Sequence, residues 1–102
     1  MKIYISGKIT RQVNYRHLFK KAEEDLLLNE HEVVNPVTIG DELTINPDWP
    51  ETKQWAGYMK ADIHAMLECD AVYMLANWED STGAVMEREI AIKCGMIILG
   101  EK

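Results

Sequence analysis

The sequence is poor in the features that mark secreted, membrane-spanning and metal-dependent proteins. Its two cysteines, Cys69 and Cys94, show neither a pairing pattern nor a metal-ligand spacing, which favours a reduced, cytoplasmic protein. The longest apolar runs are far shorter than a membrane span, and the N-terminus begins as strand-like sequence rather than as a signal peptide. The histidines at positions 17, 31 and 64 are scattered, so neither a metal centre nor a bound cofactor is expected.

Positive charge is also scarce, because 11 Lys and Arg residues stand against 17 Asp and Glu residues and leave a net charge of −6. A nucleic-acid polymer needs a cationic binding surface, so a ligand of that kind is not expected. A small anion held by a few local donors remains compatible with this composition. The 102 residues suit a single domain with a modest core, spanning residues 1–102.

What the sequence does have is a regular alternation of strand-like and helix-like segments. Strands are expected at residues 3–5, 32–35, 70–76 and 96–99, and helices at about 14–29, 52–68 and 83–93. Residues 36–51 hold all three prolines and are expected to form a long loop. The alternation predicts an α/β domain, a three-layer sandwich with a four-stranded parallel sheet of order 2-1-3-4 and helices on both faces.

In such a sheet, ligands bind beyond the carboxyl ends of the strands, at the point where the strand order reverses. Residues 6–10 and 77–81 are expected to meet there. Ser81, Thr82 and Gly83 then begin a helix whose free backbone N–H groups suit an anion, although Ser81 can equally be a plain N-cap. The aromatic residues that can stack on a base in this crevice, or simply pack in the core, are Tyr4, Trp49 and Trp78.

Two carboxylates fall on helix faces that should be apolar. The small-residue side of the last helix contains Ala84, Glu87, Ala91 and Cys94, and Asp62 interrupts the apolar stripe of the preceding helix. Because a buried unpaired carboxylate is costly, Asp62 can be a cap or a partner of Lys8 or Arg88, and Glu87 can lie at a helix rim. Taken together, two carboxylates facing one crevice match the minimum requirement for cleaving a glycosidic bond, a nucleophile and an acid.

Three segments, "MKIYISGKIT", "YMKADIHAMLECDAVYML" and "WEDSTGAVMEREIAIKCG", follow one another and cover nearly the whole chain. With them the chain resembles the nucleoside 2-deoxyribosyltransferase-like family, particularly its short bacterial and phage members. The resemblance implies a flavodoxin-like (Rossmann-like) sheet, cleavage of the N-glycosidic bond of deoxynucleosides or deoxynucleotides, and a homodimer whose sites are completed by the neighbouring subunit. Glu87 matches the family's nucleophile and Asp62 its base-side carboxylate, while Tyr4 and Gly7 match the motif that faces the sugar.

Several positions depart from the pattern of that family. Lys8 replaces the usual proline after Ser-Gly, and Arg11 replaces the usual glycine after Thr10. Ser81 stands where the sugar transferases carry an acidic residue, and it resembles the branch that hydrolyses deoxynucleoside 5′-monophosphates, in which this serine contacts the phosphate. Asp80 is adjacent, so a shift of one residue would restore the transferase arrangement.

The resemblance and the two carboxylates predict a mechanism. Glu87, oriented by Tyr4, is expected to attack C1′ of a 2-deoxyribosyl group while protonated Asp62 assists the leaving base, before water or a second base releases the sugar. The residues expected to bind this substrate are Ser6, Gly7, Lys8, Ile9, Trp78, Ser81, Gly83 and Ala84. Two other interpretations remain open: a nucleotide-binding or sensing module without turnover, and glycosidic cleavage of another ribosyl ligand such as NAD.

Overall fold

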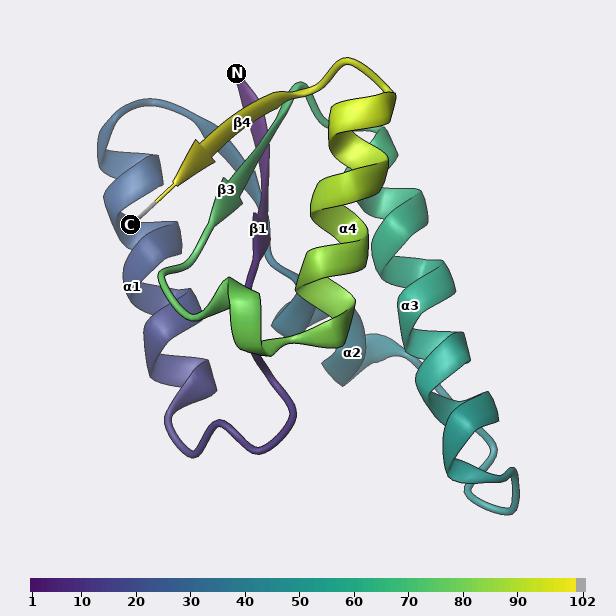
Figure 1. The fold of residues 1–102 in the computed structure, drawn as a ribbon. Helices are drawn as coiled ribbons and strands as arrows, with labels where there is room; N and C mark the ends of the chain where they lie inside the picture. Colours follow the sequence, from purple (N-terminus) through teal and green to yellow (C-terminus); the bar gives the residue numbers. More distant parts are fainter. Residues whose placement is uncertain (101–102) are drawn as a thin grey trace.

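The computed structural model, which describes residues 1–100, has four parallel strands between two layers of helices (Figure 1). In chain order the elements are β1 (Lys2–Ser6), α1 (Tyr15–Leu28), β2 (Glu32–Val34), α2 (Pro36–Glu42), α3 (Glu51–Leu67), β3 (Ala71–Met74), the 3₁₀ helix η1 (Trp78–Asp80), α4 (Thr82–Lys93) and β4 (Ile97–Gly100). The strand order is β2-β1-β3-β4, which confirms the predicted order and fold class.

Strand β1 lies at the centre of the sheet and is covered on both faces. Ile3 is paired with Val33 of β2 and with Ala71 of β3, all in parallel register. Successive side chains of a strand point to opposite faces, so Ile5 lies on the α1 side and Tyr4 on the side of α3 and α4. A central strand of a parallel sheet is apolar on both faces for this reason, as the sequence of β1 is.

Each face of the sheet has its own apolar core. Under α1, Phe19 and Ala22 pack against Ile5 and Leu75. Under α3 and α4 the core is larger, and its buried members are Tyr4, Met66, Cys69, Val72, Met74, Ala84 and Ala91. The two alanines come from α4, and their small side chains let that helix approach the strands closely. Cys94, expected on the same side, is instead exposed at the end of α4.

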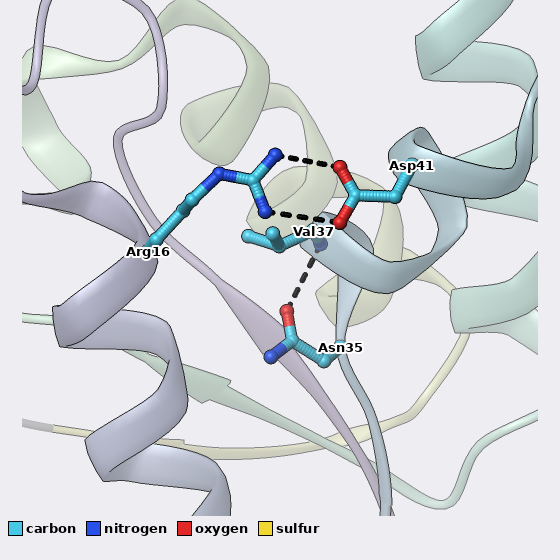
Figure 2. A network of polar contacts seen from close by, with 4 residues as sticks. All are labelled: Arg16, Asn35, Val37 and Asp41. Atoms are coloured by element: carbon cyan, nitrogen blue, oxygen red, sulfur yellow. Dashed lines mark hydrogen bonds and ion pairs between the residues drawn. The ribbon is translucent and has the colours of Figure 1, made fainter.

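The predicted loop at residues 36–51 is wrong in its first half, because Pro36–Glu42 forms the short helix α2. Pro36 occupies the first helical position, where a missing N–H costs nothing and the fixed φ suits a helix. The Asn35 side chain accepts a hydrogen bond from the Val37 N–H at 2.9 Å and caps the helix (Figure 2). Asn35 and Pro36 start a helix here, although the same two residue types are also common in turns. Counting such residues therefore cannot tell a helix start from a turn.

The start of α1 also differs in detail from the expectation. Asn14 is the N-cap residue, but its side chain does not bond to the helix backbone and instead accepts a hydrogen bond from Gln12 Nε2 at 2.7 Å. The helices α1 and α2 thus start by different means, and of these two only α2 has a side-chain cap.

Candidate active site

A cleft of about 560 Å³ opens at the carboxyl ends of β1 and β3, where the strand order reverses. Nine of the residues expected at a site line it: Tyr4, Gly7, Lys8, Ile9, Asp62, Ser81, Gly83, Ala84 and Glu87. They come from β1 and the segment after it, from α3, and from the N-cap and first half of α4. The cleft therefore brings together residues that lie far apart in the sequence.

Glu87 is held by two hydroxyl groups from the central strand. Its carboxylate accepts hydrogen bonds from Tyr4 Oη, 2.7 Å from Oε2, and from Ser6 Oγ, 2.7 Å from Oε1. Tyr4 and Ser6 are two positions apart in β1, so their side chains point to the same face of the sheet. Only 5% of Glu87 is exposed. The carboxylate on the small-residue side of α4 thus meets two donors at the sheet.

The surroundings of Glu87 act on its pKa in opposite directions. Burial is the larger effect and raises the pKa of this carboxyl above its ordinary value, while the hydrogen bonds from Ser6 and Tyr4 oppose the rise. Burial and the nearby Glu87 carboxylate raise the pKa of the Tyr4 hydroxyl well above its ordinary value, so Tyr4 stays protonated and remains a donor. Both hydroxyls therefore stabilise the ionised form of Glu87 inside a poorly solvated site.

Asp62 is buried on α3 but is unpaired. Its exposed fraction is 9%, and no hydrogen-bond or ion-pair partner is found for it among residues 1–100. Burial, and next the charge of Glu87, raise the pKa of Asp62 to about 7. Neither of the partners suggested by the sequence is in place: Lys8 makes no ion pair in the described chain, and the Arg88 guanidinium lies 4.8 Å from the centre of the Trp78 ring.

The beginning of α4 forms one wall of the cleft. Ser81 is the N-cap residue, and its Oγ accepts a hydrogen bond from the Ala84 N–H at 3.1 Å. Thr82 and Gly83 follow it on the cleft wall. A Cβ atom on Gly83 would lie 3.2 Å from Met59 Sδ, so glycine lets α4 and α3 approach closely here. The helix cap and the close packing together place the free N–H groups of α4 at the cleft.

Three residues singled out in the sequence lie outside the cleft wall. Ser6 is fully buried behind Glu87, and its hydroxyl faces that carboxylate rather than the open cleft. Trp78 packs against the core under α3 and α4 and is covered by Arg88. Trp49 lies before α3, where the Lys53 ammonium stands 4.1 Å from its ring centre. Neither indole lines the cleft.

The sequence pattern does not identify every residue of the cleft. Trp55 and Tyr58 belong to the apolar stripe that Asp62 interrupts, yet each is 39% exposed and both line the cleft. Arg11, also at the cleft, has a φ of +62°, in the left-handed region that favours glycine. This backbone conformation fits the glycine that is usual here in the nucleoside 2-deoxyribosyltransferase-like family. The replacement of that glycine by Arg11 is the sequence feature that could have indicated a role for Arg11.

The family of the chain follows from a comparison over nearly its whole length. Residues 1–100 match the family model described as "Domain of unknown function (DUF4406)". The chain belongs to the DUF4406 family. No curated protein matches this DUF4406 sequence.

The fold of the DUF4406 chain has a counterpart among solved structures. The chain is similar to the structure described under "Characterization of 2-deoxyribosyltransferase from psychrotolerant bacterium Bacillus psychrosaccharolyticus", with a TM-score of 0.73 and 20% sequence identity. The match covers 98% of this chain and 71% of that one. The likeness confirms the fold that the resemblance to the nucleoside 2-deoxyribosyltransferase-like family implied.

Two kinds of feature are absent from residues 1–100 of the DUF4406 chain. No helix in this range is long and apolar enough to cross a membrane. Nor do three His, Cys, Asp or Glu side chains gather there into a group that could hold a metal ion.

Proposed function

We propose that this DUF4406 chain cleaves the N-glycosidic bond of 2′-deoxynucleosides or their 5′-monophosphates through a covalent glycosyl intermediate on Glu87. One observation carries the proposal: both oxygens of a buried carboxylate are held by Tyr4 and Ser6, and this carboxylate shares a cleft with unpaired Asp62. Two carboxylates in different environments are the arrangement that double displacement at an anomeric carbon requires.

In the first step, Glu87 acts as the nucleophile. An oxygen of its ionised carboxylate forms a bond to C1′ as the bond from C1′ to the base nitrogen breaks. The hydroxyls of Tyr4 and Ser6 favour the ionised carboxylate against the effect of burial and fix its orientation, so little reorganisation is needed when it attacks. Burial of Glu87 between the sheet and α4 therefore contributes to the mechanism by holding the carboxylate in one orientation.

Asp62 acts in the same step as the acid. With a pKa of about 7, a large fraction of Asp62 carries its proton near neutral pH. That proton passes to the departing base, which leaves neutral, and Asp62 becomes a carboxylate. In the second step the Asp62 carboxylate takes a proton from water, or from a second base, as that acceptor attacks C1′ and releases Glu87.

Assay of base release from a panel of deoxynucleosides and their monophosphates tests this function. Wild type should release free base, and Glu87→Gln should release none, at an unchanged circular dichroism spectrum. Glu89→Gln is the matched control, since Glu89 is an exposed carboxylate on the same helix and lies outside the cleft. Adding a free base to the reaction distinguishes the two acceptors, because a transferase then makes a new nucleoside, whereas a hydrolase makes free sugar and free base and no new nucleoside. Tight binding without any released base would instead support a sensing module.

A homodimer remains part of this proposal. Trp55 and Tyr58 stand half-exposed at the cleft, and a second copy covering them would also exclude water from Glu87 and Asp62. Light scattering at assay concentrations measures the mass in solution. A monomer with full activity would contradict completion of the site by a neighbouring subunit.

A further inference from the structure

A second, smaller cavity of about 240 Å³ adjoins the cleft. The residues that line both cavities are Ile9, Pro36, Tyr58 and Asp62. Glu87 lines the cleft but not the second cavity. Asp62 therefore borders both the cleft that contains Glu87 and the second cavity. A molecule that reacts at Glu87 and receives a proton from Asp62 can extend into this second space.

The walls of the second cavity suit a flat heteroaromatic ring. Two tyrosines, Tyr15 from α1 and Tyr58 from α3, line it together with apolar side chains that include Ile9 and Val37. Aromatic and apolar walls favour stacking of a planar ring. Apart from Asp62, the charged residues on these walls are Arg16 and Asp41.

Arg16 and Asp41, which both line this cavity, form a forked ion pair between α1 and α2 (Figure 2). Arg16 Nη1 lies 2.9 Å from Asp41 Oδ2, and Arg16 Nη2 lies 2.6 Å from Asp41 Oδ1. The cap of α2 by Asn35 fixes the helix that carries Asp41. About half of each charged side chain is solvent-exposed, at 59% for Arg16 and 50% for Asp41, so further lone pairs and N–H groups remain open to a ligand.

We propose that the second cavity receives the base of the substrate, and that the Arg16–Asp41 pair distinguishes bases by the amino or carbonyl group on their far edge. The inference rests on the proposed function. Glu87 attacks C1′ on the face opposite the departing base, so the base lies on the Asp62 side of the sugar. The cavity beyond Asp62 is then its place, and the ion pair meets the edge remote from the glycosidic nitrogen.

Each half of the pair favours a different base. The Asp41 carboxylate only accepts hydrogen bonds and selects an amino group, as in adenine or cytosine. The Arg16 guanidinium only donates and selects a carbonyl group, as in hypoxanthine or uracil. Neutralising Asp41 should therefore shift preference toward carbonyl bases, and neutralising Arg16 should shift it toward amino bases.

The test measures catalytic efficiency for deoxyadenosine and deoxyinosine, and for deoxycytidine and deoxyuridine, in wild type and variants. We expect Asp41→Asn to lower the amino-to-carbonyl ratio by roughly tenfold or more, and Arg16→Gln to raise it by a similar factor, as for loss of one charge-assisted hydrogen bond. Asp25→Asn is the matched control, since Asp25 belongs to an exposed ion pair of α1 with Lys21 and lines neither cavity. Its ratios should equal those of wild type. If both variants change all four substrates by the same factor, the pair is only structural and the inference is overturned.

A binding measurement separates this inference from the proposed function. If wild type releases no base from any substrate, glycosidic cleavage is wrong. In that case, calorimetry on the same proteins gives the dissociation constants of free adenine and free hypoxanthine. Their ratio then replaces the amino-to-carbonyl ratio of catalytic efficiencies. Opposite shifts in Asp41→Asn and Arg16→Gln support the assignment of the second cavity. Absence of binding of either base, in a protein without turnover, overturns it.

Discussion

Tyr4 and Glu87 are 83 residues apart in the sequence, and the Tyr4 hydroxyl donates a hydrogen bond of 2.7 Å to the Glu87 carboxylate. The contact joins the central strand β1 to the middle of α4. Such a contact exists only after the sheet has formed and α4 has packed against it on Ala84 and Ala91. The nucleophile proposed here is thus fixed by the tertiary structure rather than by its local sequence.

Removing one donor from Glu87 should slow the reaction and shift its pH dependence. In Tyr4→Phe the ring still fills the core, but the ionised form of Glu87 loses a hydrogen bond worth about 1.5–3 kcal/mol. The pKa of Glu87 then rises, so the acidic limb of the rate profile should move to higher pH, and catalytic efficiency should fall roughly ten- to a hundredfold. Ser6→Ala, which removes the other donor, should shift the limb in the same direction. An unmoved limb in both variants would contradict Glu87 as the attacking group.

Asp62 should set the alkaline limb of the same profile. Its acid role needs the protonated form, and because its pKa is raised to about 7, activity should decline as the pH rises above that value. Asp62→Asn should lose roughly a hundredfold or more in efficiency, since an amide cannot supply the proton, and should flatten the alkaline limb. The measurement is base release between pH 5 and 9. A limb that persists in Asp62→Asn would assign the titration to another group.

The raised pKa of Asp62 also predicts a pH-dependent stability. The folded chain holds this proton up to about pH 7, while an unfolded Asp releases it near 3.8, so the folded state binds more protons between these values. The contribution is therefore fully present below pH 3.8 and is lost as the pH rises toward 7. Asp62→Asn should be more stable than wild type at pH 8 by about 1–3 kcal/mol, and by less at pH 5. Urea unfolding at both pH values measures the difference.

Lys8 and Arg11 should decide between nucleotides and nucleosides. Both cations line the cleft opposite the beginning of α4, where Ser81 and the free N–H groups suit a 5′-phosphate, although Asp80 also lines it. We expect Lys8→Ala or Arg11→Ala to lower the ratio of efficiencies, monophosphate over nucleoside, by roughly tenfold.

The control for this ratio is Lys60→Ala, an exposed cation on α3 that lies outside the cleft. It carries the same charge and should leave the ratio unchanged. Wild-type preference for the nucleoside would show that Ser81 serves only as the cap of α4.

The strands and their order were predictable because parallel strands need continuous apolar runs and each connection contains a helical repeat. The start of α2 was not, because Pro36 and Asn35 suit a helix start as well as a turn, and only the cap contact separates the two. Asp62 and Glu87 stood out because charges on apolar faces violate the helical pattern. Their surroundings depend on the packing of separate elements, so neither the Ser6 contact with Glu87 nor the exposure of Trp55 could be predicted.

The two hydroxyls that hold Glu87 come from β1, whereas Arg16 and Asp41 come from two helices beside the sheet. Substitutions at Arg16 or Asp41 therefore leave the residues that hold Glu87 unchanged, because the two sets of residues lie on different elements. Under the assignments proposed above, substitutions in α1 and α2 would change the preferred base, while β1 and α4, which hold Glu87 and its two donors, would stay unchanged. Relatives could then share one reaction and differ in the base that they accept.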